Sequence, residues 1–547
     1  MPAYAKNRNA TVYVAFLDIK KAFDTVWVNG LLFKLLEAGL RKKSWSLIYN
    51  SYKDYECAAY VGGKGAPWFK PERGVHQGAP LSMPLYQIFI NDLLKQLRSS
   101  KFAIKMFDIN IGSPSFADDI SIPTLSKRGL NCQLNTAYLY SIRWQFEYSL
   151  EKSLAMIWGN DTASDISITF GNRDIKIVDK LKHVGITLQT LNHTADSLTA
   201  DSIKKAKCTL LAARGIGSAS VPVPPSTLSK LYWAVAIPRA LYGIEILPFE
   251  RLNVCELENA HRQNAKLIQG LPGNTPRPSP LMTLGWISIQ SFIEMRKIVF
   301  LLSILSLPAS NIYRRITLHI LLQCSISIEL PRYSPVASMF KCILKYDLQN
   351  VLIDFVMNGG GHLPQTKVKI KKIVWEYEVK RWNSMKLMYP DLENYYNCVT
   401  RPCLNVWWKY VAKFPNMNIY VRSLMAVLMG GQPLGLQCNF NSKMCKLCTY
   451  GNLENPAHVL FACSALQDTR DNTWARLLQV MPDAMSIGIE NCNNDEKINQ
   501  IFTCYGGSYI SEWNEIYAQT AKMVYKMYHA RYESYTNLNL ILNLNMN

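Results

Sequence analysis

Two adjacent aspartates, Asp118 and Asp119, are the residues whose types and position most directly suggest chemistry. They lie in residues 115–122, where short β-prone residues flank the acidic pair, so this stretch predicts a strand, a tight turn and a second strand. Like charges side by side at a hairpin tip repel each other unless a cation or solvent relieves them. An Asp-Asp pair alone is usually a solvated turn, so a metal site requires a third carboxylate.

Asp18 can supply the third carboxylate. Residues 12–17 form a continuous β-prone run that ends on Asp18, as a buried strand with a carboxylate at its exit would. Alone, Asp18 would also suit a turn or a helix entry. A helix is predicted next, because apolar residues recur at helical spacing before Gly39: Leu31, Leu32, Leu35 and Leu36.

A loop rich in glycine and proline, residues 73–84, lies between these two acidic segments. Gly78 lets backbone approach a ligand closely, and the neighbouring Gln77 amide offers both a donor and an acceptor. Ser82 with Pro84 can open a helix. Its predicted apolar face is Leu85, Ile88, Phe89 and Leu93.

In order, three segments resemble motifs A, B and C of reverse transcriptases: residues 16–24 (FLDIKKAFD), 73–82 (RGVHQGAPLS) and 116–119 (FADD). Two later segments are similar to motifs D and E: residues 151–156 (EKSLAM) and 182–188 (KHVGITL). The sequences of these motifs are most similar to those in the enzymes of non-LTR (LINE-type) retrotransposons. The resemblance implies an RNA-directed DNA polymerase that uses deoxynucleoside triphosphates, an RNA template and a DNA primer or target.

The same resemblance implies an α+β fold. A right-hand polymerase palm, an antiparallel sheet with helices, would occupy residues 1–190. An α-helical thumb is expected over 191–300, a helical connector of unknown role over 301–436, and a small zinc-binding module over 437–547. Family members carry a sizeable fingers region before motif A, whereas seventeen residues precede Asp18 here. The fingers are therefore expected to be truncated, with a fingers or endonuclease segment of the same element as a possible upstream partner.

In-line attack of a primer 3′-hydroxyl on a nucleotide is served by two divalent ions about 3.5–4 Å apart. Mg²⁺ prefers oxygen ligands and usually takes one or two carboxylates. By resemblance, Asp18 and Asp118 would bind the two Mg²⁺ ions, Asp119 would assist, and the backbone carbonyl of Ile19 would complete the second ion's shell.

Four more residues acquire roles through the resemblance. Phe23 matches an aromatic ring that blocks a ribose 2′-hydroxyl, although a plain core phenylalanine would look the same. Gln77 and Gly78 match the loop under the nascent base pair. Lys152 matches a lysine placed to protonate the leaving pyrophosphate, or it is an exposed surface lysine. Ser149 stands where the family generally has asparagine, which weakens the match at Lys152.

The bulk composition agrees with a nucleic-acid partner. Sixty Lys and Arg against forty Asp and Glu give a formal charge of +20, which suits a polyanion but is also compatible with solubility alone. The thumb would hold template and primer by phosphate contacts. The longest apolar run, residues 298–307, is too short to span a bilayer. We expect an intracellular protein without a membrane partner, nuclear during integration and otherwise cytoplasmic with RNA.

Aromatic residues in the predicted thumb have two readings. Tyr232, Trp233 and Tyr242 could stack on bases, but their helical spacing among apolar neighbours favours core positions. Lysines alternate with apolar residues over 367–372, which suits either a nucleic-acid surface or a solvated helix face.

A second metal site is predicted near the C-terminus. Cys445, Cys448, His458 and Cys463 follow the pattern C-x2-C-x9-H-x4-C, which has the ligands of a closed tetrahedral Zn²⁺ site. The pattern resembles the CCHC segment near the C-terminus of LINE-type polyproteins, which is thought to contact template RNA or target DNA. A purely structural zinc clip is the alternative.

Two other functions remain open. One is a catalytically silent remnant that keeps the basic thumb and the zinc module and binds nucleic acid. The other is a group II intron maturase-like RNA-splicing cofactor. The intact carboxylate triad favours the polymerase, the short fingers favour the remnant, and the terminal CCHC segment argues against the maturase.

Overall fold

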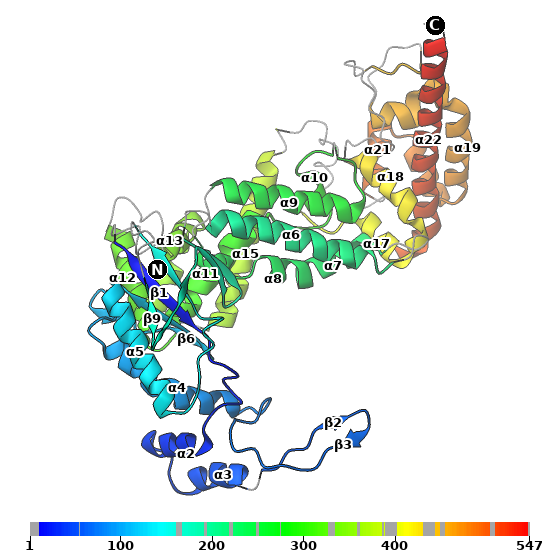
Figure 1. Cartoon of the computed structure of the whole chain (residues 1–547). Coiled ribbons are helices and arrows are strands. Elements are labelled where there is room, and N and C mark those ends of the chain that lie inside the picture. Colours follow the sequence, from blue (N-terminus) through cyan, green and yellow to red (C-terminus); the bar gives the residue numbers. More distant parts are fainter. Residues whose placement is uncertain are drawn as a thin grey trace.

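The structure is a computed structural model of the 547-residue chain. It describes residues 10–53, 55–159, 167–190, 194–217, 223–247, 251–273, 275–326, 334–357, 362–385, 388, 402–429, 444–448, 455–503 and 509–544. The chain forms an elongated, bent molecule, with a mixed α/β part at the N-terminal end and helices from there to the C-terminus (Figure 1). The predicted α+β class is confirmed.

A five-stranded sheet organises the N-terminal part, with strand order β11-β8-β1-β7-β6. The central strand β1 runs antiparallel to both of its neighbours, β7 and β8. The strands are β1 (Val12–Leu17), β6 (Ser115–Phe116), β7 (Asp119–Thr124), β8 (Leu154–Trp158) and β11 (Lys176–Ile177). The strand predicted over 12–17 and the hairpin predicted over 115–122 are therefore both confirmed.

Both faces of β1 are covered, and all six of its residues are buried. One set of alternate side chains packs with the helices α2, α4 and α5, while the other packs with β8 and the hairpin β12–β13. The helices are α2 (Val28–Glu37), α3 (Lys42–Lys53), α4 (Ser82–Ser99) and α5 (Lys127–Arg143). The short hairpins are β4 (Lys105–Met106) with β5 (Ile109–Asn110), β9 (Thr169–Phe170) with β10 (Arg173–Asp174), and β12 (Lys180–His183) with β13 (Ile186–Gln189).

Local signals explain these helices. Gly39 follows α2 with φ +93°, a conformation that glycine adopts without strain, so the predicted helix stop is confirmed. The α4 face predicted from the sequence is buried at Leu85, Phe89 and Leu93, while Ile88 is half-buried.

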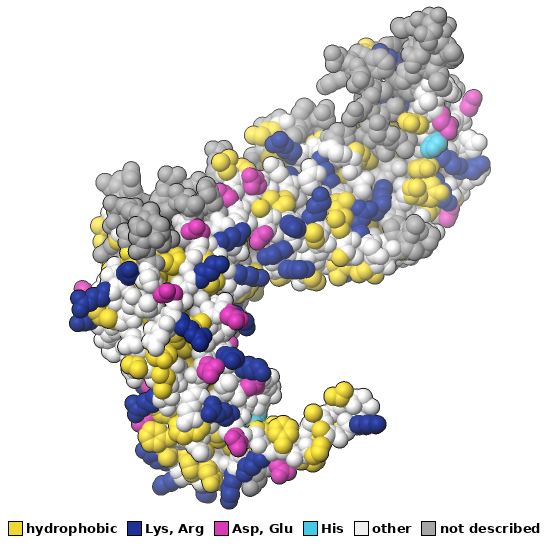
Figure 2. All heavy atoms as spheres, in the orientation of Figure 1, with side chains coloured by type: hydrophobic (Ala, Val, Ile, Leu, Met, Phe, Trp, Pro, Cys, Tyr) yellow, Lys and Arg dark blue, Asp and Glu magenta, His cyan; other side chains and the backbone are white. Residues whose placement is uncertain are grey.

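A two-stranded arm, β2 (Tyr60–Val61) with β3 (Lys64–Gly65), projects away from the body below α4 (Figure 1). Every residue from 59 to 70 is exposed. Figure 2 shows apolar side chains along this arm, which carries Tyr60, Val61, Trp68 and Phe69. An isolated hairpin of this kind has little stability of its own.

The remainder of the described chain is helical, as expected for residues 191–300. The helices nearer the sheet are α6 (Thr194–Arg214), α7 (Pro225–Leu231), α8 (Ile237–Ala240), α9 (Arg251–Gln269), α10 (Ser279–Met282), α11 (Ile289–Leu305), α12 (Ile312–Ile326), α13 (Pro335–Lys345), α14 (Gln349–Met357) and α15 (Leu363–Met385). Toward the C-terminus they are α17 (Val406–Lys413), α18 (Asn418–Leu428), α19 (Gln467–Gln479), α20 (Asp483–Glu490), α21 (Asn494–Phe502) and α22 (Asn514–Leu544).

Two hydrophobic cores hold the helices. One joins buried residues of 206–293 to buried residues of 407–528, so helices far apart in sequence share it. The other gathers buried residues of 298–374. Beside it, Phe107 of the β4–β5 turn stacks on His319 of α12 with ring centres 5.0 Å apart. The domain boundaries expected at 190, 300 and 436 stay predictions. No helix in the described ranges is long and apolar enough to cross a membrane.

The aromatic residues of the predicted thumb differ from one another. Tyr232 is buried and stacks on Trp286 with ring centres 4.6 Å apart, and Trp233 packs against the same core, so the core reading is confirmed for both. For Tyr242 it is wrong, because 55% of this residue is exposed. Its ring instead lies beside Gly185 of the β12–β13 hairpin, where helical periodicity could not place it.

A buried lysine joins α2 to α4 and α5. Lys34 is 2% exposed, and its ammonium donates to the backbone oxygen of Phe89 and the hydroxyl of Tyr140. The ammonium also lies 3.2 Å from Oδ2 of Asp92 and 3.7 Å from the centre of the Trp144 ring. Burial lowers the pKa of Lys34 from 10.5 to about 8, although Asp92 opposes this shift.

Because the folded pKa of Lys34 is below the unfolded one, the unfolded chain binds more protons between pH 8 and 10.5, and stability rises with pH across this window. We predict that the free energy of unfolding increases by about 2 kcal/mol between pH 8 and pH 10, relative to a Lys34→Met variant. Urea denaturation of both proteins under reducing conditions measures this difference. Parallel pH profiles would show that Lys34 does not carry a buried charge.

Candidate active site

The carboxylates meet at the exit of the central strand. Leu17 of β1 pairs with Ile120 of β7. Asp18, just after β1, and Asp119, the first residue of β7, therefore occupy the next pair of antiparallel positions, at the same end of the two strands. Asp118 lies in the two-residue turn between β6 and β7, where Ala117 has φ +54°. All three aspartates are half-buried. The third carboxylate that the sequence required is therefore beside the other two.

The charges of these aspartates act on one another. The pKa of Asp119 is raised by burial and by the charges of Asp118 and Asp18, while His183 opposes the shift. Among the described residues, the oxygen atoms of the three carboxylates do not lie close enough together to form a metal-binding group. The ligand atoms of the Cys and His cluster near the C-terminus do. Like charges this near one another are unfavourable unless a cation or solvent relieves them.

The segment that resembles motif D holds the backbone of Asp18. The Asp18 amide donates to Oγ of Ser153 at 3.2 Å, and the Ser149 amide donates to the Asp18 carbonyl at 2.8 Å. Ser153 is fully buried and its hydroxyl donates to the Ser149 carbonyl at 2.8 Å. Because Ser149 contacts Asp18 through backbone, its departure from the family's asparagine leaves this contact intact.

Lys152 reaches the site from the same segment. Its Nζ lies 3.7 Å from Oδ2 of Asp18, although most of the side chain is exposed. The lysine is thus placed beside a carboxylate of the site, where it can also meet an anionic substrate. The main chain continues on the other side of Asp18 through buried Ile19, which bridges to Tyr148.

The glycine-rich loop is locked to the turn after Asp18. Nε2 of Gln77 donates to Oδ1 of Asp24 at 2.5 Å, and the Val75 amide donates to the Phe23 carbonyl at 2.8 Å. Gly74 has φ +101°, and a Cβ there would meet the Asp24 carbonyl oxygen at 3.1 Å, so this close approach requires glycine. Gln77 and Gly78 are both exposed. The structure therefore brings the predicted nucleotide-binding residues of both segments together.

Three contributing residues escaped the sequence reading. Tyr86 of α4 stacks on half-buried Phe23 with ring centres 5.0 Å apart. His183 of the β12–β13 hairpin packs on Phe16 with ring centres 4.7 Å apart, and its Nε2 lies 3.3 Å from Oγ of Ser121. Ser153 is the third. Ser153 and His183 lie inside the segments that resemble motifs D and E, but neither was assigned a role, and the helical position of Tyr86 next to Leu85 indicates burial rather than a site.

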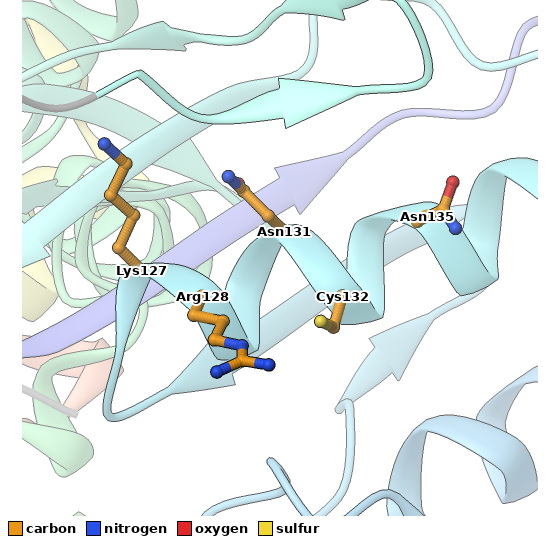
Figure 3. A pocket seen from close by; sticks show the side chains of 5 residues that line it. All are labelled: Lys127, Arg128, Asn131, Cys132 and Asn135. Carbon is orange, nitrogen blue, oxygen red and sulfur yellow. The ribbon is translucent and has the colours of Figure 1, made fainter.

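A shallow pocket of about 460 Å³ lies on α5, apart from the aspartates. All of its lining residues come from this one helix, and their side chains spread from its exposed side (Figure 3). They are Lys127, Arg128, Asn131, Cys132 and Asn135. Asn131 is already used, since its Oδ1 accepts a hydrogen bond from the Thr169 amide at 3.2 Å. The pocket adds no carboxylate to the site.

The predicted zinc ligands converge far from the aspartates. Ligand atoms of Cys445, Cys448, His458 and Cys463 all lie within 4.8 Å of one another. The Sγ atoms of Cys445 and Cys463 are 3.9 Å apart, and Sγ of Cys448 is 3.5 Å from Nε2 of His458. With Zn–S of about 2.3 Å and Zn–N of about 2.0 Å, a tetrahedral site has edges of about 3.5–3.8 Å. The donor set and spacing therefore fit Zn²⁺.

Further contacts orient the zinc ligands. The guanidinium of Arg470 donates to the Phe461 carbonyl at 3.3 Å and also to the Cys463 carbonyl. The His458 amide donates to Oδ1 of Asn455 at 2.7 Å. Burial and the Cys445 thiol raise the pKa of Cys463 to about 12, a shift that a bound cation would counter. Cys445 and Cys463 belong to the larger helical core, so a metal here would also fasten that core.

Comparison with known proteins identifies the class of protein to which the N-terminal part of the chain is similar. Residues 2–214, from the N-terminus through β1 to the end of α6, match the family model of reverse transcriptase (RNA-dependent DNA polymerase). The chain therefore contains a reverse transcriptase domain. It is related to the polymerases of non-LTR retrotransposons, and the resemblance predicted from the five motifs is confirmed.

Three relatives illustrate this. The chain is 32% identical over 124 residues to a retrovirus-related Pol polyprotein from the type-1 retrotransposable element R2 of Nasonia vitripennis, covering 23% of this chain and 12% of the relative. It is 28% identical over 245 residues to the RNA-directed DNA polymerase from mobile element jockey of Drosophila melanogaster, covering 42% and 25%. It is 22% identical over 318 residues to an R2 polyprotein of Bradysia coprophila, covering 54% and 35%. The matched parts of the chain thus span between 12% and 35% of the length of these relatives.

The zinc geometry generates a prediction. We expect the purified chain to contain one zinc per molecule, and Cys463→Ser to lose most of it and to lower the midpoint of thermal unfolding, because the ligands lie in the helical core. Metal analysis and thermal melts measure both effects. Exposed Cys132 gives the matched control, Cys132→Ser. Equal zinc content in the two variants would contradict the assignment.

Proposed function

We propose that this chain is an RNA-directed DNA polymerase of a non-LTR retrotransposon, which adds deoxynucleotides to a primer 3′-hydroxyl along an RNA template. One observation carries the proposal: Asp18, Asp119 and the turn residue Asp118 share one sheet edge, beside a glycine-rich loop tied to the same strand exit. The family match over residues 2–214 supports it. In this account the sheet is the palm and the helices from α6 onward supply the thumb.

Each of these residues would have a separate role in nucleotide transfer. Asp18 and Asp118 would hold two Mg²⁺ ions, with Asp119 and the Ile19 carbonyl assisting. Bound Mg²⁺ would activate the primer hydroxyl and stabilise charge on the leaving group. Lys152, which is within reach of Asp18, would donate a proton to the departing pyrophosphate.

The remaining side chains select the substrate. Gln77 and Gly78 would support the nascent base pair, since both are exposed beside the site. Phe23 would meet the ribose of the incoming nucleotide and exclude a 2′-hydroxyl. Phe23 lies in the turn after Asp18 and stacks on Tyr86 with ring centres 5.0 Å apart, and its half-buried position leaves part of the residue accessible.

Template and primer would lie against basic helices. Lys204 and Lys207 of α6 and Lys230 of α7 are exposed, and Figure 2 shows Lys and Arg side chains recurring along the helical part. Such contacts hold phosphates without reading sequence, so binding should weaken with salt. The proposal also assigns the zinc module to template RNA or target DNA and places the protein in the nucleus during integration.

Primer extension tests the proposal. We predict that the purified chain extends a DNA primer on an RNA template with Mg²⁺, and that Asp118→Asn lowers the rate at least about a hundredfold because a metal ligand is lost. Asp108→Asn is the matched control, since Asp108 is an exposed aspartate in another hairpin turn, with φ +60°.

Two outcomes would go against the polymerase. Equal loss in both variants would mean that the effect comes from altering an aspartate in a hairpin turn and is not specific to a metal ligand. Absence of extension by the unaltered chain, with salt-sensitive RNA binding retained, would identify a nucleic-acid-binding remnant.

The proton-donor role of Lys152 has its own test. Lys152→Gln should lower kcat by about a hundredfold with little change in KM, since general acid catalysis is worth about 10²–10⁴. Lys20→Gln is the control, because Lys20 is also exposed but pairs with Glu147 at 3.4 Å. Single-nucleotide incorporation kinetics measures both. A rise in KM alone would assign Lys152 to substrate binding instead.

A further inference from the structure

Tyr86 lies beneath the residue proposed to contact the ribose. It is the fifth residue of α4, is 2% exposed, and stacks on Phe23 with ring planes 28° apart. The backbone of Phe23 is fixed independently, because its carbonyl accepts the Val75 amide. The main chain is thus held by the glycine-rich loop, and the ring rests on Tyr86.

The hydroxyl of Tyr86 is one of several unpaired polar groups in the described core, as is that of Tyr148. It is buried and has no hydrogen-bond partner among the described residues. An unpaired buried hydroxyl destabilises a fold, and a leucine or phenylalanine at this position would avoid the loss. Burial and the charge of Asp118 raise the pKa of Tyr86. The side chain therefore interacts with the charge of the carboxylate site and also stacks on Phe23. These properties are typical of a residue that contributes to the geometry of a functional site rather than to the stability of the core.

We propose that Tyr86 is the positioning residue that holds the Phe23 ring against the ribose of an incoming nucleotide, and so sets the discrimination between deoxyribonucleotides and ribonucleotides. This inference rests on the proposed function. Without the aromatic ring of Tyr86 beneath it, the Phe23 ring can tilt into the freed space and admit a 2′-hydroxyl. The preference for the deoxy sugar then falls although the carboxylates and the glycine-rich loop are unchanged.

Three variants separate this role from general packing. Tyr86→Leu removes the stacking ring, whereas Tyr86→Phe keeps the ring and removes only the hydroxyl. Phe89→Leu is the matched control, because Phe89 is equally buried on the same helix and its ring neighbours are Trp144 and Phe146 rather than Phe23. Should Tyr86→Leu not fold, Tyr86→Met replaces it, since a flexible side chain fills irregular space.

The measurement is the ratio of kcat/KM for dCTP to that for CTP on one template and primer. We expect Tyr86→Leu to lower this ratio at least tenfold, mainly through a lower KM for CTP, while Tyr86→Phe and Phe89→Leu stay within about threefold of the unaltered chain. An unchanged ratio in Tyr86→Leu would overturn the inference. So would an equal fall in Phe89→Leu, which would assign the effect to loosened packing.

Equilibrium binding of dCTP and CTP with Ca²⁺ in place of Mg²⁺ distinguishes failure of the inference from failure of the proposed function. If the unaltered chain does not extend primers but binds dCTP more tightly, and Tyr86→Leu loses that preference, the inference stands and the polymerase proposal fails. If the unaltered chain shows no sugar preference in binding or in catalysis, the inference is overturned.

Discussion

The antiparallel pairing of β1 with β7 is the constraint on which the rest of the site depends. The register places Leu17 opposite Ile120, so the carboxylates that follow and precede these residues leave the sheet at the same edge. A slip of one residue would turn every side chain of β1 to the opposite face, so Tyr13, Ala15 and Leu17 would have to pack where Val12, Val14 and Phe16 now pack. Because β1 is buried on both faces, such a slip is strongly disfavoured.

The other parts of the site are tied to the exit of this strand by backbone or short polar contacts. The Ser149 amide holds the Asp18 carbonyl, and Gln77 holds the side chain of Asp24. Four segments from different parts of the chain are therefore held in fixed positions relative to one another. The carboxylates are also adjacent, and burial together with the charges of Asp118 and Asp18 raises the pKa of Asp119, as expected at a site that a cation would stabilise.

Local patterns predicted what local forces determine. The strand over 12–17, the hairpin with its acidic tip, the helix beginning at Ser82 and the zinc ligands were all readable, because each depends on spacing, turn residues or ligand chemistry. The contacts of Tyr86 and His183 were not, since they arise where distant segments pack. The same holds for the core shared by residues 206–293 and 407–528, and for exposed Tyr242, whose spacing wrongly indicated burial.

The most direct test of this account is the electron paramagnetic resonance spectrum of Mn²⁺ added to the chain with template, primer and a nucleotide that cannot be incorporated. We predict two Mn²⁺ ions bound as a magnetically coupled pair, as expected for ions about 3.5–4 Å apart, and loss of the coupling in Asp18→Asn. A spectrum of isolated ions that is the same in both proteins would contradict the claim that the strand pairing assembles a two-metal site.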